Sequence, residues 1–220
     1  MKVPERLPVE PSPPLAYALG PRLYLNLTSR CTLRCTFCPK WTHGEVWGQQ
    51  LRLARQPAAE ALVHAAGDVT GYREVVFCGL GEPTRRLETL LTVARQLRAG
   101  GARRLRLNTD GLANLIYGGD VTPELSEAID AFSVSLNAPD AITYARLCPS
   151  RYGAAAYEAV CEFIYALHRT SSRVVASAVA LPGLDLTACR RRAVEDLGVP
   201  FHVRRFKPPT SRTAWRERRR

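Results

Sequence analysis

The sequence predicts an α/β fold, a partial (β/α)6 TIM-like barrel with parallel strands. Short apolar segments alternate with helical segments along most of the chain, and strands separated by helices pair in parallel through right-handed crossovers. The alternation alone would also fit an open doubly wound sheet. The barrel is favoured because cysteines, glycines and polar residues follow the ends of successive strands, and those ends gather around one mouth in a (β/α) barrel.

One core domain with two flanking segments is predicted. The chain has 220 residues, 46% of them apolar, which is enough to bury one sizeable core. Residues 1–20 contain five of the sixteen prolines and no sustained apolar period, so we expect an extended N-terminal arm that lies on the surface or leads into the first strand. The core domain is predicted at residues 21–206 and a basic C-terminal tail at residues 207–220.

The first predicted strand has the sequence LYLNLTS, in which apolar and polar residues alternate as in a half-buried strand. The later strands are short apolar runs that lie between helical segments. The six predicted strands cover residues 23–29, 74–77, 105–108, 132–137, 174–180 and 201–206.

One helix is predicted between each pair of successive strands. Gly100 and Gly101 end the second helix, and Thr122 opens the third helix with Pro123 in its first turn. The fourth helix is long and amphipathic. The five predicted helices cover residues 58–66, 87–99, 123–129, 155–168 and 186–197.

Three of the seven cysteines, Cys31, Cys35 and Cys38, lie within eight positions directly after the first predicted strand. Their spacing would also suit one face of a helix, but the threonines between them and the proline after them do not suit a buried helix interior. Structural zinc needs four closed ligands, and no fourth cysteine or histidine stands at zinc-finger spacing. Three thiolates suit an iron–sulfur cluster with one open iron. The remaining thiols, which show no mutual metal spacing, are Cys78, Cys148, Cys161 and Cys189.

With Phe37 in the aromatic place, this segment resembles the radical S-adenosylmethionine (SAM) superfamily, whose signature is CxxxCx(aromatic)C. The resemblance implies that Cys31, Cys35 and Cys38 are catalytic and hold a [4Fe-4S] cluster whose fourth iron binds SAM, with Phe37 beside the cofactor. It implies that the reduced cluster splits SAM into methionine and a 5′-deoxyadenosyl radical, which abstracts hydrogen from a substrate. An electron donor such as flavodoxin or ferredoxin is then expected.

A glycine-rich turn follows the second predicted strand. Its residues Gly79, Gly81 and Glu82 lie in Gly-Leu-Gly-Glu-Pro, which resembles the Gly-Gly-Glu-Pro element that binds the methionine ammonium of SAM in that superfamily. Glycines let backbone carbonyls approach a ligand, and the Glu82 carboxylate can accept a hydrogen bond from an ammonium. A Gly-x-Gly tripeptide near a proline is also typical of an ordinary tight turn.

Polar residues end the third and fourth predicted strands. In a parallel sheet that is buried on both faces, Asn108, Thr109, Ser135 and Asn137 are out of place unless they are paired. The resemblance implies that they contact the carboxylate and ribose of SAM; turn capping and core hydrogen bonds are the alternatives. Arg146 is expected either to pair with the SAM carboxylate or a substrate anion, or to be an exposed helical arginine.

Two longer stretches, 107–125 and 135–149, resemble one subgroup, the radical SAM proteins associated with TatD-type nucleases. This resemblance extends from about residue 23 to about residue 204 and implies the fold and the cofactor, with no substrate assigned. Three alternatives stay open: a glycyl-radical activating enzyme, a nucleic-acid-binding or tRNA-modifying protein, and an iron–sulfur protein without catalytic activity.

The net charge of +11 is concentrated at the C-terminus, where residues 204–220 carry eight Lys and Arg residues and one Glu. Such a tail can bind phosphates non-specifically, although a solvated end has the same composition. No apolar stretch is long enough for a membrane span, and the N-terminus lacks the apolar stretch of a signal peptide, so a cytoplasmic protein without a membrane partner is expected.

Six strands span only part of a closed barrel, so the mouth is expected to be open. We expect it to be completed by the unknown substrate, which is predicted to be macromolecular or anionic, by a partner, or by a lid at residues 39–55 with Trp41 and Trp47.

Overall fold

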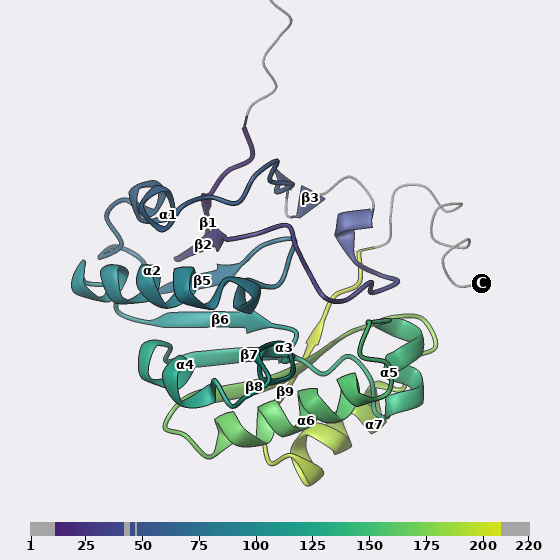
Figure 1. The fold of residues 1–220 in the computed structure, drawn as a ribbon. Helices are drawn as coiled ribbons and strands as arrows, with labels where there is room; N and C mark the ends of the chain where they lie inside the picture. The colour runs from purple at the N-terminus through teal and green to yellow at the C-terminus, as the bar shows by residue number, and fades with distance from the viewer. Residues whose placement is uncertain (1–11, 42–44, 47, 208–220) are drawn as a thin grey trace, which may run out of the picture.

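The computed structural model of the chain describes residues 12–41, 45–46 and 48–207. Its seven sheet strands are β1 (Ala16–Leu19), β2 (Arg22–Asn26), β5 (Glu74–Cys78), β6 (Leu105–Thr109), β7 (Ala131–Ser135), β8 (Arg173–Val179) and β9 (Phe201–Arg204). They form one sheet in the order β1-β2-β5-β6-β7-β8-β9 (Figure 1). β1 is antiparallel to β2, and all other neighbours are parallel. A separate hairpin consists of β3 (Glu45–Val46) and β4 (Gln49–Gln50).

Helices fill the connections between the parallel strands. The α-helices are α1 (Ala59–Ala66), α2 (Leu87–Ala99), α3 (Ala113–Tyr117), α4 (Thr122–Ala128), α5 (Ala141–Leu147), α6 (Ala155–His168) and α7 (Leu186–Arg191). α1 packs against α2, α2 against α4 and α4 against α6, which gives a helical layer outside the sheet (Figure 1). Two 3-10 helices are η1 (Pro39–Trp41) and η2 (Pro83–Arg86), and a π-helix is η3 (Arg192–Asp196). None of the helices in the described part of the chain is long and apolar enough to cross a membrane.

The predicted fold class is confirmed, since β2 and β5 to β9 are six parallel strands in sequential order, as in a partial (β/α)6 barrel. Each of them overlaps its predicted segment. The reason is visible in β6, where Leu105 and Leu107 are fully buried in the main core together with helix residues such as Leu90 and Val93. The apolar runs that predicted the strands are therefore the residues that bury this core.

Several short elements of the structure were not predicted: β1, α3, α5, the hairpin of β3 and β4, and the 3-10 helices η1 and η2. β1 lies within the predicted arm and forms by pairing with β2 across the turn at Gly20 and Pro21, where its alanines give only a weak apolar alternation. α3 and α5 have 5 and 7 residues, too few for a clear helical period, and both pack against α6. The predicted last helix, 186–197, begins as α7 and continues as η3. Residues 1–11 and 208–220, which hold much of the predicted arm and most of the tail, lie outside the described residues.

The two faces of the sheet differ in polarity. On β6, Leu105 and Leu107 face the helical layer, whereas Arg106 and Asn108 alternate with them and point to the opposite, inner face. Helices therefore cover the apolar face, and the inner face carries polar side chains. The ends of the parallel strands on this inner face form the mouth where the predicted site residues gather.

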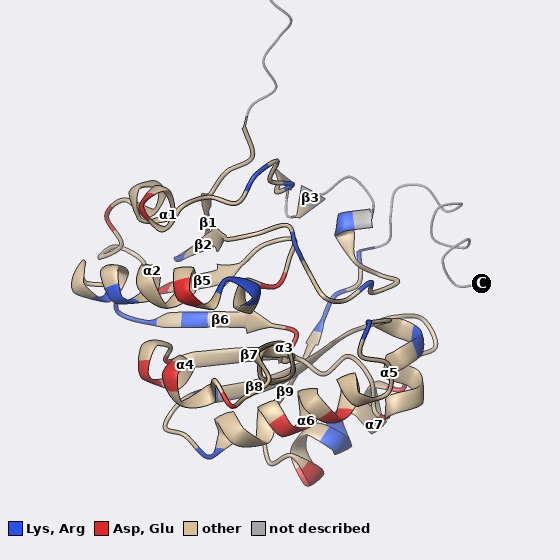
Figure 2. Cartoon of the chain, viewed as in Figure 1, with Lys and Arg blue, Asp and Glu red and all other residues tan. Residues whose placement is uncertain are grey.

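An arginine cluster, formed by Arg22, Arg104 and Arg106, lies at the beginning of β2 and β6 on the inner face. All three guanidinium groups surround one carboxylate, that of Glu74, at 3.1, 3.4 and 3.0 Å. Figure 2 shows basic residues on β6 and in the segment that leads into it. One carboxylate balances one of three positive charges, so this end of the inner face carries an excess of positive charge.

Candidate active site

The loop that follows β2 carries the three cysteines of the predicted cluster. Cys31, Cys35 and Cys38 are free, half-buried thiols. Burial raises the pKa of Cys31 and raises the pKa of Cys38 to about 11, and the pKa of Cys35 is raised by a hydrogen bond with Cys148 and by burial. At neutral pH all three are therefore protonated, and a metal that binds them displaces protons. Among the described residues, no three His, Cys, Asp or Glu side chains are arranged to hold a metal ion, so the thiols share a loop without converging.

The segment that follows α5 lies along the cysteine loop and is hydrogen-bonded to it. The backbone N–H of Arg34 donates to the carbonyl of Pro149 (2.8 Å), and the N–H of Thr36 donates to the carbonyl of Leu147 (2.9 Å). Cys148, between these two acceptors, is the buried thiol that contacts the second cysteine of the loop. The sequence predicts no role for Cys148, because its contact with Cys35 spans more than a hundred residues and leaves no signal in local spacing.

The glycine turn after β5 packs against the beginning of the cysteine loop. Gly81 N–H donates to the Thr28 carbonyl (2.8 Å), and a Cβ on Gly81 would overlap the backbone of Arg30. A Cβ on Gly79 would come within 2.7 Å of the Asn26 side chain, and Gly79 has a φ of +138°. These glycines are therefore required for contact between two segments of the chain. The sequence had suggested a different role for these glycines, which was to let backbone carbonyls approach a ligand.

Glu82 connects the glycine turn to the end of β6. Its side chain is 3% exposed, one oxygen accepts hydrogen bonds from Thr84 N–H (3.0 Å) and the Thr109 hydroxyl (2.8 Å), and the other accepts from Asp110 N–H (2.6 Å). Burial and then the nearby Asp110 carboxylate raise the pKa of Glu82 to about 8. The predicted residues Glu82 and Thr109 are thus brought together, and they bond to each other.

Replacing Glu82 by Gln in the metal-free protein is expected to destabilise the fold by about 1–3 kcal/mol, because an amide nitrogen cannot accept the hydrogen bond from Asp110 N–H. The folded pKa of about 8 exceeds the unfolded value of 4.5, so the contribution of Glu82 to stability is fully present below pH 4.5 and is lost as the pH rises towards 8. The difference between wild type and variant should shrink across this window. Urea unfolding at several pH values measures it, and a constant difference would contradict the assigned shift.

Asp110 is a site residue that the sequence analysis missed. Its carboxylate accepts a hydrogen bond from the Thr32 hydroxyl (3.2 Å) and a longer one from the Cys31 thiol (3.9 Å), and it also accepts from Leu112 N–H (3.0 Å). Burial raises its pKa. The sequence Asn-Thr-Asp-Gly after the third strand contained the signal, because a buried Asp needs partners nearby.

Arg204, at the end of β9, joins two of the predicted residues. Its guanidinium donates to the Asn137 side-chain oxygen (2.8 Å) and to the Ser135 hydroxyl (3.2 Å), and burial lowers its pKa. Asn137 has a φ of +57° and also donates to the Cys148 thiol (3.7 Å). Ser135 and Asn137 thus lie together beside the segment that contacts the cysteine loop.

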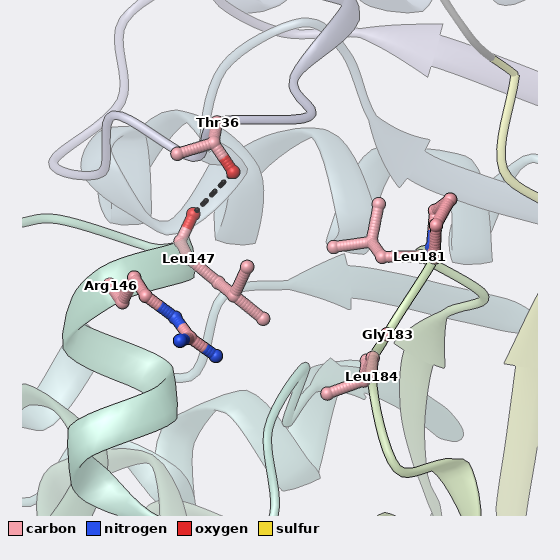
Figure 3. A pocket seen from close by; sticks show the side chains of 7 residues that line it. Thr36, Arg146, Leu147, Leu181, Gly183 and Leu184 are labelled. Atoms are coloured by element: carbon pink, nitrogen blue, oxygen red, sulfur yellow. Dashed lines mark hydrogen bonds between the residues drawn. The ribbon is translucent and has the colours of Figure 1, made fainter. Parts of the chain in front are cut away.

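A hollow opens beside the cysteine loop, between the end of α5 and the loop after β8 (Figure 3). The space between its lining residues is about 360 Å³, a volume that includes open solvent. Arg146 is exposed at this hollow, as one of the two sequence alternatives expected, and Phe37 packs against the main core nearby. The lining residues are Thr36, Arg146, Leu147, Leu181, Pro182, Gly183 and Leu184.

The predicted lid at residues 39–55 lies only partly within the described residues, which leave out 42–44 and Trp47. Its later part lies against the sheet, since Leu51 packs with Tyr17 and Leu80 and its carbonyl accepts a hydrogen bond from Asn26 (3.0 Å). That residues 39–55 cover the mouth stays a prediction.

Comparison with known protein families shows to which family the chain belongs. The family model of the radical SAM superfamily matches residues 25–190, which include the end of β2, the cysteine loop and all of β5, β6, β7 and β8. The chain belongs to the radical SAM superfamily. Membership implies SAM and an iron–sulfur cluster as cofactors.

Solved radical SAM structures share the fold. A radical SAM methyltransferase from Sphaerobacter thermophilus is 21% identical, with a TM-score of 0.59 over 92% of this chain and 64% of its own. SuiB of Streptococcus suis bound to S-adenosylmethionine is 16% identical, with a TM-score of 0.63 over 91% and 41%. The hydrogenase maturase HydG from Carboxydothermus hydrogenoformans is 16% identical, with a TM-score of 0.56 over 84% and 44%. The chain thus spans less than two thirds of these proteins, and no curated protein is significantly similar in sequence.

The side chains of this radical SAM protein have the donor chemistry that suits a sulfur-bound group at the cysteine loop. Three free thiols supply the donors that an iron–sulfur cluster needs. Buried polar atoms rarely lack a hydrogen-bond partner, and a bound water, ion or ligand is a common partner for those that have none in the polypeptide. Among the described residues, such atoms include Asn26 Oδ1, Asn108 Oδ1, the Tyr144 hydroxyl and Arg204 Nε.

Proposed function

We propose that this radical SAM enzyme cleaves SAM reductively and generates a 5′-deoxyadenosyl radical, with a [4Fe-4S] cluster bound by Cys31, Cys35 and Cys38. The observation that carries the proposal is the loop of three free thiols beside buried polar atoms that lack partners. The bound cluster supplies the electron that splits the sulfonium of SAM. A small electron-transfer protein such as flavodoxin or ferredoxin is the proposed donor.

The residues at the strand ends are proposed to bind and orient SAM. Asn108 Oδ1 is a buried acceptor without a partner among the described residues, which suits a hydrogen bond from the ammonium or a ribose hydroxyl of SAM. Ser135 and Asn137 are aligned by Arg204 and are proposed to contact the ribose and carboxylate.

The glycine turn is proposed to bind SAM through its backbone at Gly79 and Gly81. The oxygens of Glu82 already accept hydrogen bonds from Thr84, Thr109 and Asp110, so we assign Glu82 to holding the turn in place behind the ligand. Thr109 supports Glu82 in the same role.

The hollow beside the cysteine loop is proposed to receive the adenosyl part of SAM. Leu147, Leu181 and Leu184 offer apolar walls that suit a purine, and Phe37 holds the adjoining loop against the core. Arg146 at the rim is proposed to pair with an anionic group of SAM or of the substrate.

The substrate is proposed to carry an anionic group. Arg146 is exposed at the rim of the hollow beside the cysteine loop, where its guanidinium can pair with such a group. The arginine cluster lies at the beginning of the strands, away from this mouth, and has no part in the proposal. We also propose that the chain belongs to the TatD-associated subgroup, because stretches 107–125 and 135–149 resemble that subgroup. This membership does not identify the substrate.

Replacing Arg146 by Gln is expected to weaken the binding of an anionic probe, inorganic pyrophosphate, about fivefold, because one contact between exposed charges is lost. Arg95→Gln on α2 is the matched control, since Arg95 is exposed on the helical layer away from the inner face. Calorimetry on both variants measures the effect. Equal affinity in wild type and Arg146→Gln would remove Arg146 from the substrate site.

The function is tested by anaerobic reconstitution of the protein with iron and sulfide, followed by addition of SAM and dithionite. We expect equal amounts of methionine and 5′-deoxyadenosine. A reconstituted protein that holds iron and sulfide but forms no 5′-deoxyadenosine would identify an iron–sulfur protein without this activity.

A further inference from the structure

Tyr144 on α5 has a buried hydroxyl with no hydrogen-bond partner in the described part of the chain. The residue is 1% exposed and is one of the largest fully buried side chains. Its ring packs against Tyr157 with the ring centres 5.5 Å apart. A hydroxyl in such surroundings normally finds a partner, since its removal from water is unfavourable without one. The unpaired hydroxyl therefore indicates a partner that the polypeptide itself does not supply.

Tyr144 lies one helical turn before Cys148, whose N–H donates to the Tyr144 carbonyl (2.7 Å) and whose thiol contacts Cys35 of the cysteine loop. Burial raises the pKa of Tyr144 most, and the negative charges of Cys148, Asp110, Cys35 and Cys31 raise the pKa further, in that order. Two of these four groups are proposed cluster ligands, and the other two contact those ligands. The phenol therefore keeps its proton at neutral pH and is available as a hydrogen-bond donor.

The helix α5, which carries Tyr144, is capped at its beginning and hydrogen-bonded to the cysteine loop at its end. At the beginning of the helix, the Asp140 carboxylate accepts a hydrogen bond from Thr143 N–H (2.8 Å), which caps the first turn. At the other end, the Leu147 carbonyl accepts from the loop residue Thr36 (2.9 Å). The helix that carries Tyr144 and the loop that carries the thiols are thus joined as one unit.

We propose that Tyr144 is a positioning residue that donates its O–H to a sulfur of the iron–sulfur cluster and thereby raises the reduction potential of that cluster. The inference rests on the proposed function. Hydrogen bonds to cluster sulfurs are one of the means by which proteins set cluster potentials. The reduced cluster carries one more negative charge than the oxidised cluster, so a donor stabilises the reduced form more. No bond of the phenol breaks, and its proton stays on the oxygen.

The test is Tyr144→Phe, which removes only the hydroxyl and keeps the ring that packs against Tyr157. A redox titration of the reconstituted protein, followed by electron paramagnetic resonance, is expected to give about a tenfold lower ratio of reduced to oxidised cluster at a fixed potential, or about 59 mV for one electron. Tyr157→Phe is the matched control, because its hydroxyl donates to the Ala138 carbonyl (3.2 Å), and it should leave the potential unchanged.

A second measurement detects the hydrogen bond itself. Electron–nuclear double resonance of the reduced wild type should show a strongly coupled proton that exchanges in D₂O and that Tyr144→Phe lacks. An unchanged potential together with an unchanged proton coupling overturns the inference. A folded Tyr144→Phe protein that loses its cluster also overturns it, since Tyr144 would then hold the loop and not tune the potential. Absence of a cluster in the wild type would instead refute the proposed function.

Discussion

Replacement of Cys35 by Ala is expected to abolish assembly of the iron–sulfur cluster, with iron content and visible absorbance falling to background after anaerobic reconstitution. The same result is expected for Cys31→Ala and Cys38→Ala, since the proposed cluster has only three protein ligands and each holds one iron. The control is Cys189→Ala. Cys189 is fully buried in α7, and its neighbours in the structure are core residues of that helix layer, so its loss should leave iron content unchanged.

A different ligand set would give a different pattern. Cys148 lies against Cys35 and could replace it as a ligand after substitution. Iron that persists in Cys35→Ala but disappears in the Cys35→Ala, Cys148→Ala double variant would identify Cys148 as that substitute. Iron that depends on Cys189 and not on Cys35 would contradict the assignment altogether.

The sheet could be predicted because its strands are defined by local patterns. β6 follows the helix end at Gly100 and its apolar residues Leu105 and Leu107 are fully buried, so both the stop signal and the apolar run stand in the sequence itself. The cysteine spacing was informative for the same reason, because three ligands of one cluster lie within a single loop. A site whose ligands all lie in one short segment can be predicted from the sequence without knowledge of the fold.

The rest of the candidate site could not be predicted because it consists of contacts between distant segments. Arg204 reaches Asn137 across 67 positions, and Asp110 accepts from Thr32 across 78. No spacing rule connects such residues until the strands are arranged side by side. Tyr144 was missed for another reason: a tyrosine on a short helix is unremarkable until its hydroxyl is known to be buried without a partner.

The glycine turn could be predicted from its local sequence, but the structural role of its glycines could not, because that role is a contact with a distant segment. The resemblance suggested that Gly79 and Gly81 let SAM approach. In the structure, these glycines let the turn after β5 approach the residues that precede Cys31. The turn and the cysteine loop therefore depend on each other for their positions, and a change in one should disturb the other.

Replacement of Gly81 by Ala is expected to destabilise the fold by about 3 kcal/mol, the upper part of the range for overpacking, and to reduce cluster assembly strongly. The added methyl group would overlap the Arg30 backbone and lie 2.7 Å from the Thr28 carbonyl, and backbone atoms cannot move aside as a flexible side chain can. Displacing these residues moves Cys31.

Gly119→Ala is the matched control for Gly81→Ala, because a Cβ at Gly119 meets nothing within 4 Å and its φ is outside the left-handed region. That variant should differ from wild type by less than about 0.5 kcal/mol. Urea unfolding of the metal-free proteins gives the stabilities, and iron content after reconstitution gives the cluster yield. If Gly81→Ala were as stable as Gly119→Ala and bound iron equally well, the close contact between the glycine turn and the cysteine loop would be wrong, and with it the coupling of the two elements.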